Sequence, residues 1–126
     1  MSIQCTEAEW KILELLWDRE PRTMPEITRA LEGQTGWTRQ TVISLLRRMQ
    51  AKGTVACDDS GPLRLYTARV RAQEARRDQT RRLVDRVFGG RASLLVSSLV
   101  EGGELTEKER EEILRILRQG SSGKEK

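Results

Sequence analysis

The clearest pattern of apolar and polar positions in this chain lies between residues 37 and 53. Four apolar residues there follow the spacing i, i+3, i+4, i+7: Val42, Leu45, Leu46 and Met49. This spacing places them on one face of a helix. Thr38 is a residue type that caps helix N-termini, and Gly53 stands where such a helix ends. The pattern therefore predicts an amphipathic helix between Thr38 and Gly53.

The opposite face of this predicted helix is polar and basic. It carries Gln40, Ser44 and Arg47, with Ile43 and Arg48 at its edges. The segment 37–52 has no acidic residue but has four basic ones. Such a face suits DNA, because short polar side chains reach base edges in the major groove and arginines hold phosphates. A solvated surface helix has the same pattern, and this segment alone does not separate the two interpretations.

Two shorter helices are expected before this one. The segments 6–9 and 23–26 both read Thr-x-x-Glu, which is the capping box that begins a helix. The first helix follows with a wide apolar face, typical of a core element. The second is expected to be short, from about residue 24 to 31, with a turn at residues 33–36 that contains two glycines.

A β-hairpin is expected after Gly53. Residues 54–58 and 63–67 are short extended runs around a turn rich in Asp, Ser, Gly and Pro at 59–62. Val55 and Cys57 in the first run, and Leu63 and Leu65 in the second, alternate with polar or small residues. Three short helices followed by a hairpin are the pattern of a winged helix-turn-helix, with the hairpin as its wing. We therefore expect a mostly α fold with one small hairpin.

The pattern changes near residue 71. Residues 72–88 contain no Gly or Pro and predict a long helix, and residues 93–100 predict a short, very apolar one. A third capping box at 106–109 predicts a last helix that ends near Gln119. We thus expect a winged helix-turn-helix domain at 1–70, a helical dimerisation domain at 71–120 and a disordered tail at 121–126.

The last three helices hold too few large residues to bury one another. Their apolar side chains would leave a sizeable apolar surface exposed on a monomer, and pairing with a second copy would cover it. The residues expected to form this dimerisation surface are Leu83, Val87, Phe88, Leu94, Leu95, Leu99, Ile113, Leu114 and Leu117.

The net charge of +4 is distributed unevenly. Residues 1–70 carry 10 Lys and Arg against 9 Asp and Glu, residues 71–91 carry 7 against 3, and residues 92–126 carry 6 against 7. This asymmetry argues for a polyanionic partner better than the modest total does. The arginines of the long helix are open to two interpretations: a solvated or salt-bridged face, or a second contribution to phosphate binding.

Reactive side chains are scarce. The chain has no histidine and two distant cysteines, Cys5 and Cys57, which excludes the usual zinc patterns and any His-based triad. No nucleophile–base pair or phosphate-binding glycine loop is evident, so we expect no enzyme activity and no cofactor or metal. The cysteines are most simply small buried apolar residues, with redox sensing as the alternative.

No apolar run reaches the ~20 residues of a membrane span, and residues 1–5 lack a secretion signal, so a cytoplasmic protein is expected.

Several short motifs follow one another along the chain in a characteristic order and spacing. They are Thr6-Glu7-Ala8-Glu9-Trp10, Leu16-Trp17, Trp37-Thr38, Thr41-Val42, Leu45-Leu46, Met49, Lys52-Gly53, Leu65-Tyr66, Phe88-Gly89-Gly90 and Glu104-Leu105-Thr106. Together they resemble the penicillinase/methicillin-resistance repressor family (BlaI/MecI), over about Ile3 to Gln119. The resemblance implies a homodimeric transcriptional repressor that occludes a palindromic operator in double-stranded DNA.

The resemblance also implies which residues contact DNA. Thr38, Gln40, Thr41, Ser44 and Arg48 fall where the family contacts it. Ile43 departs from relatives that carry a basic residue there, and it would contact a thymine methyl group instead. Together with the residue patterns, this gives the full candidate set for DNA binding: Thr38, Arg39, Gln40, Thr41, Ile43, Ser44, Arg47, Arg48, Lys52 and the wing residue Arg64.

Two regulatory features of the family match this chain less well. Members that control β-lactam resistance are inactivated by proteolysis in a short apolar helix of the dimerisation region, commonly at Asn-Phe. The matching dipeptide is Ser98-Leu99, the candidate site for a membrane-bound sensor protease, but a β-lactam response is not implied. Copper-responsive relatives carry Cys-x-Cys pairs near the C-terminus, and this chain has none. The alternative function is a winged-helix module that binds a protein without sequence-specific DNA binding.

Overall fold

A computed structural model describes residues 5–120 of the chain. Contacts divide the chain into two compact units, Met1–Thr80 and Arg81–Lys126. In the described part there are six helices and one two-stranded antiparallel sheet. This confirms the prediction of a mostly helical fold with one hairpin.

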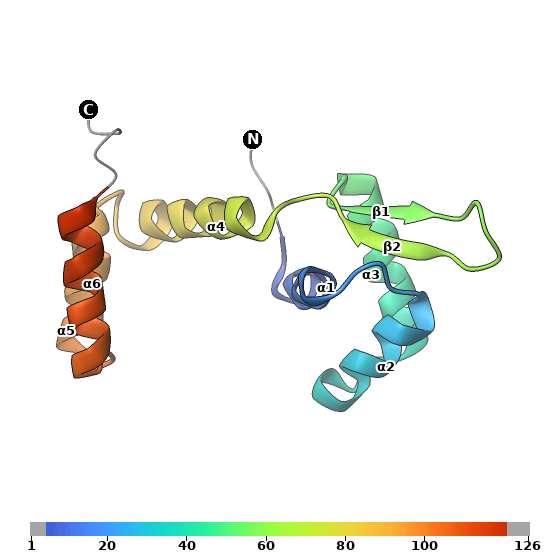
Figure 1. Ribbon diagram of the computed structural model, residues 1–126, viewed down its shortest axis with the longest axis horizontal. Helices are drawn as coiled ribbons and strands as arrows, with labels where there is room; N and C mark the ends of the chain where they lie inside the picture. The colour runs from blue at the N-terminus through green and yellow to red at the C-terminus, as the bar shows by residue number, and fades with distance from the viewer. Residues whose placement is uncertain (1–4, 121–126) are drawn as a thin grey trace. The chain divides into compact units, whose positions relative to one another are not determined.

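The N-terminal unit contains three helices followed by a hairpin (Figure 1). The helices are α1 (Glu7–Asp18), α2 (Met24–Thr35) and α3 (Arg39–Lys52), and the hairpin strands are β1 (Val55–Asp58) and β2 (Leu65–Ala68). The capping boxes predicted at 6–9 and 23–26 are present. In each, the threonine hydroxyl accepts a hydrogen bond from the glutamate N–H, and the glutamate side chain accepts one from the threonine N–H.

Helix α2 is longer than the sequence predicted. It runs through Gly33 to Thr35 and ends at Gly36, whose φ of 73° lies in the left-handed region. The prediction of a turn that begins at Gly33 was therefore wrong. Gly33 costs the helix only about 1 kcal/mol, whereas the left-handed position that closes a helix strongly favours glycine, and that position is Gly36.

One apolar core holds the helices and the hairpin together. All three helices and both strands contribute buried side chains, namely Ile12, Leu13, Leu16, Ile27, Leu31, Val42, Leu45, Leu46, Met49, Val55 and Tyr66. Trp10 and Trp17 meet edge to face at 5.2 Å between ring centroids, and the Trp17 indole N–H donates to the Val70 carbonyl oxygen at 2.9 Å. Cys5 and Cys57 are half-buried, and both pack against this core.

The hairpin pairs Val55 with Ala68 and Cys57 with Tyr66. Tyr66 is the residue of β2 that is buried, whereas Leu63 is 60% exposed and precedes the strand. The predicted alternation of Leu63 and Leu65 was wrong, because a large aromatic ring gains more from burial than a leucine in the turn before the strand. Arg22 adds a short bridge beside Tyr66, with backbone hydrogen bonds of 3.1 and 2.8 Å.

The remaining helices are α4 (Ala72–Val87), α5 (Ala92–Glu101) and α6 (Glu107–Gln119). The boundary between the two units falls within α4. The third capping box is present at Thr106, as predicted. The predicted disordered tail at 121–126 lies outside the described residues.

Candidate nucleic-acid interface

Helix α3 presents one buried face and one exposed face. The four apolar residues predicted to hold it, Val42, Leu45, Leu46 and Met49, are at most 5% exposed. Gln40, Ser44 and Arg47 follow the spacing of the opposite face, and all three are exposed. Thr41, Arg48 and Lys52 are exposed along one edge of this face, and Ile43 is half-buried at the other edge. The predicted amphipathic helix is thus confirmed.

The N-terminus of α3 is held by its own threonines. The Thr38 hydroxyl accepts a hydrogen bond from the Thr41 N–H, and the two hydroxyl oxygens lie 3.3 Å apart. Thr38, Arg39 and Gln40 are exposed at this end of the helix. The first N–H groups of a helix attract anions, so this end combines exposed short side chains with a partial positive charge.

The turn between α2 and α3 is fixed by local hydrogen bonds. The Thr35 hydroxyl donates to the Leu31 carbonyl oxygen at 2.8 Å and accepts from the Trp37 N–H at 3.1 Å. Gly36 supplies the left-handed conformation, and Trp37 packs partly against the core. These contacts set the direction in which α3 leaves α2.

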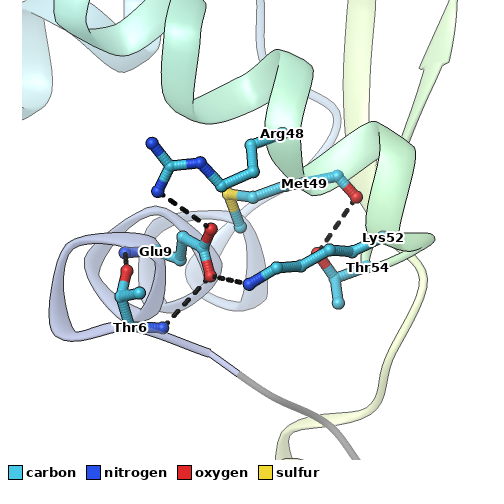
Figure 2. A network of polar contacts seen from close by, with 6 residues as sticks. All are labelled: Thr6, Glu9, Arg48, Met49, Lys52 and Thr54. Atoms are coloured by element: carbon cyan, nitrogen blue, oxygen red, sulfur yellow. Dashed lines mark hydrogen bonds and ion pairs between the residues drawn. The ribbon is translucent and has the colours of Figure 1, made fainter.

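The C-terminal end of α3 is tied to α1 through a buried carboxylate. Glu9 is 1% exposed, and its Oε1 accepts a hydrogen bond from Lys52 Nζ at 2.7 Å (Figure 2). Arg48 Nη1 lies 3.6 Å from Glu9 Oε2. Two of the predicted DNA-binding residues therefore face an internal negative charge. Only part of each cation is covered, because the Arg48 side chain is 52% exposed and that of Lys52 is 33% exposed.

The wing carries charges of both signs. Arg64, the predicted wing contact, is exposed just before β2. Asp58 and Asp59 are exposed at the start of the turn. Hydrogen bonds from the Ser60 hydroxyl and N–H hold the pKa of the Asp58 carboxyl below its usual range, so this group is ionised at neutral pH. The turn therefore carries two carboxylates next to the positive charge of Arg64.

The predicted dimerisation residues are poorly covered within the chain. Leu83, Val87, Leu94, Leu114 and Leu117 are between 36% and 66% exposed. The others, Phe88, Leu95, Leu99 and Ile113, are half-buried. Val96, Val100 and Ile116 add further exposed apolar surface.

Ser98 and Leu99, the candidate cleavage dipeptide, lie inside α5. Ser98 is exposed, Leu99 is half-buried, and the Ser98 carbonyl oxygen accepts the Gly102 N–H at 3.0 Å. Proteases bind an extended substrate, so cleavage at this dipeptide requires local unfolding of α5.

Sequence reasoning missed two buried charges in the N-terminal unit. Glu9 was expected only to cap α1, although it shares the helical spacing of the core residues Ile12, Leu13 and Leu16, which would have indicated its burial. Arg22 is 7% exposed, and its Nε donates to the Leu15 and Arg19 carbonyl oxygens while it pairs with Asp18. No sequence signal distinguished Arg22 from a surface arginine.

Residues 5–120 contain no cluster of three or more His, Cys, Asp or Glu side chains that could hold a metal ion. None of the helices described is both long and apolar enough to cross a bilayer.

Three helices, a hairpin and an exposed polar face on the third helix define a winged helix-turn-helix protein. The sequence model of the penicillinase repressor family matches residues 5–119, nearly the whole chain. The chain belongs to this family, and is therefore a DNA-binding transcriptional repressor and not an enzyme.

Individual relatives are distant but collinear with the chain. The methicillin resistance regulatory protein MecI of Staphylococcus aureus strain N315 is 23% identical over 114 residues, which cover 90% of this chain and 93% of MecI. The penicillinase repressor of Bacillus licheniformis is 21% identical over 121 residues, covering 96% and 94% of the two chains. This chain thus aligns with almost the full length of both proteins.

Two solved structures share the fold of more than half of the chain. The DNA-binding domain of the repressor BlaI superposes with a TM-score of 0.52 at 21% identity, covering 59% of this chain and 93% of that domain. The Bacillus licheniformis BlaI monomeric form, solved in complex with the blaP half-operator, gives a TM-score of 0.53 at 20% identity, covering 59% and 90%.

Proposed function

We propose that this repressor binds a palindromic operator as a homodimer and blocks transcription by occluding it. The exposed polar face of α3 is the observation that carries the proposal. This face has no acidic side chain, lies opposite the buried residues of the same helix and begins at an exposed N-terminus. A helix with these features fits the major groove.

The proposed contacts fall into two groups. Thr38, Gln40, Thr41 and Ser44 would read base edges, with Ile43 against a thymine methyl group. Positively charged residues would hold phosphates, namely Arg39, Arg47, Arg48, Lys52 and the wing residue Arg64. BlaI, a relative of the same fold, was solved bound to a half-operator, which supports DNA as the ligand.

The exposed apolar residues of the C-terminal unit support the homodimer. Eight large apolar side chains between Leu83 and Leu117 are at least 36% exposed. Apolar surface left open on this scale marks an interaction site. A two-fold dimer would cover it and present two copies of α3 to two half-sites.

Relief of repression by a membrane-bound sensor protease is the regulatory part of the proposal. Helix α5 supports it, because it buries no side chain in the single chain and its N-cap residue Arg91 makes no side-chain capping bond. In a chain released from the proposed dimer, such a helix unfolds locally at low cost. Mass spectrometry of protein from induced cells should detect a fragment that ends at Ser98, whereas an intact chain under inducing conditions would contradict this part.

Selection of bound fragments from genomic DNA, followed by fluorescence anisotropy, tests operator binding. We expect a palindromic sequence bound about 10³-fold or more tighter than a scrambled duplex at physiological salt. The logarithm of the binding constant should fall linearly with the logarithm of salt concentration. Equal, salt-insensitive binding of both duplexes would instead favour a protein-interaction module.

A further inference from the structure

The carboxylate of Glu9 occupies an unusual position, between the N-terminus of α1 and the last two turns of α3. Its two oxygens are paired differently: Oε1 is hydrogen-bonded, whereas the buried Oε2 has no hydrogen-bond partner among the described residues and faces the charge of Arg48. Oε1 accepts hydrogen bonds from the Thr6 N–H at 3.1 Å and from Lys52 Nζ at 2.7 Å, and Oε2 lies 3.6 Å from Arg48 Nη1 (Figure 2). Lys52 and Arg48 are thus the links between this buried acid and the helix proposed to enter DNA.

The two cations differ in how closely Glu9 holds them. Lys52 makes a short hydrogen-bonded ion pair and is two-thirds covered, whereas Arg48 stands 0.9 Å farther away and is half-exposed. A buried carboxylate is unfavourable unless it is paired, so the Lys52 contact compensates Glu9. The Arg48 side chain is 52% exposed at the edge of the proposed recognition face, and a guanidinium has five N–H donors, more than one carboxylate oxygen can occupy.

We propose that Glu9 is a positioning residue for DNA binding. It ties the end of α3 to α1 by keeping Lys52 in an internal ion pair, and it leaves the half-exposed Arg48 available for a DNA phosphate. This inference rests on the proposed function and refines it. Of the two DNA-binding candidates that face Glu9, Arg48 makes a phosphate contact and Lys52 positions the helix instead.

The variant E9Q isolates the charge of Glu9. Glutamine has nearly the same shape and is also a capping-box residue, so the α1 cap formed with Thr6 persists. E7Q is the matched control, because Glu7 lies in the same first turn, is exposed, and gives the same change in net charge. Operator and scrambled duplexes are titrated with each variant over a range of salt, and affinities are corrected for the folded fraction measured by circular dichroism.

The salt dependence separates a positioning role from a purely structural one. We expect E9Q to weaken operator binding about tenfold relative to E7Q, because a change to one member of an ion-pair network also affects the residues paired with it. The slope of the logarithm of the binding constant against the logarithm of salt concentration should become steeper by up to about 0.9, which is the value for one phosphate contact. The reason is that Lys52, once released from Glu9, can reach the DNA. The double variant E9Q/K52M should return to the wild-type slope. A loss of stability alone would change none of these corrected quantities.

Two further variants keep the proposal testable even where E9Q fails to fold. R48Q should make the salt dependence of the binding constant shallower by about 0.9 in slope, and K52M should leave this slope unchanged. A reduced slope for K52M would show that Lys52 holds a phosphate and would overturn the proposal. So would an E9Q protein that matches E7Q in operator affinity and slope. Wild-type protein that cannot distinguish operator from scrambled duplex would instead refute the proposed function itself.

Discussion

Cys5 shows how burial decides the chemistry of a single residue. Burial against the core, together with the negative charge of Glu9, raises the pKa of the Cys5 thiol to about 11, and Lys52 opposes the shift. The reactive form of cysteine is the thiolate, so Cys5 is largely unreactive at neutral pH. This favours the packing interpretation of Cys5 over redox sensing.

The raised pKa of Cys5 predicts a loss of stability at high pH. The thiol of the unfolded chain ionises near the ordinary cysteine pKa of 9.0, whereas the folded one ionises near a pKa of about 11. The contribution of the neutral Cys5 thiol to the free energy of unfolding is therefore fully present below pH 9 and is lost as pH rises towards 11. Urea unfolding at about pH 8, 9.5 and 10.5 should show wild-type protein losing more stability than Cys5→Ala. Parallel losses in the two proteins would contradict the assignment.

Two glycines, one inside α2 and one that closes α3, should respond oppositely to alanine. Gly53 has a φ of 87°, where a Cβ costs about 1–2 kcal/mol, so Gly53→Ala should destabilise the protein. Gly33 lies inside α2 with no atom near the added Cβ, so Gly33→Ala should stabilise it by about 0.5–1 kcal/mol. Thermal unfolding of both variants shows whether each one is more or less stable than the wild-type protein. A destabilised Gly33→Ala protein would argue that α2 ends earlier in solution.

At the scale of the helices, local sequence signals predicted most of what is observed. The three capping boxes and the buried face of α3 depend on residues within two turns of one another, and all were predictable. The end of α2 was not, because either Gly33 or Gly36 can close a helix and only packing selects between them. Tyr66 replaced Leu63 on the inner face of the hairpin for the same reason.

The candidate site was predictable only in part. Its exposed face follows from helical spacing, but the Glu9–Lys52 pair joins residues 43 positions apart and depends on how α1 packs on α3. Arg48 and Lys52 looked alike in the sequence, as two basic residues near the end of one helix. Their different distances from Glu9 give them different roles in the structure.

Substitutions at two positions of helix α3 should separate the recognition of base sequence from the binding of phosphates. Gln40→Ala should remove discrimination at one base pair, worth about 1–3 kcal/mol, because glutamine pairs with a base edge. Arg47→Ala should weaken binding to all sequences alike and lower the salt slope by about 0.9. Lys108→Ala is the control for the lost charge, since Lys108 is exposed at the start of α6.

Anisotropy titrations with a panel of single-base operator variants make this measurement. A uniform loss across the panel for Gln40→Ala, or a base-specific loss for Arg47→Ala, would reverse the two assignments.

At the scale of the whole molecule, operator affinity should depend on the exposed apolar surface of the C-terminal unit, which is distant in sequence from the DNA-binding helix α3. Leu117 is 66% exposed on α6, so replacing it with aspartate removes no core contact from a monomer but places a charge in the proposed dimer interface. Two linked half-site contacts bind roughly 10²- to 10⁴-fold more tightly than one. Leu117→Asp should therefore be monomeric at micromolar concentration and lose at least about 100-fold in affinity for the palindrome.

The matched control for this prediction is Gln119→Asp, which adds the same charge in the last turn of α6 on its polar face. It should remain dimeric and bind the palindrome normally. Sedimentation velocity measures the oligomeric state, and titration with an isolated half-site measures the intrinsic contact, which both variants should retain because α3 is untouched. Weak half-site binding by Leu117→Asp would point to damage within the monomer. A dimeric Leu117→Asp protein would move the interface away from α6, towards the exposed residues of α4 and α5.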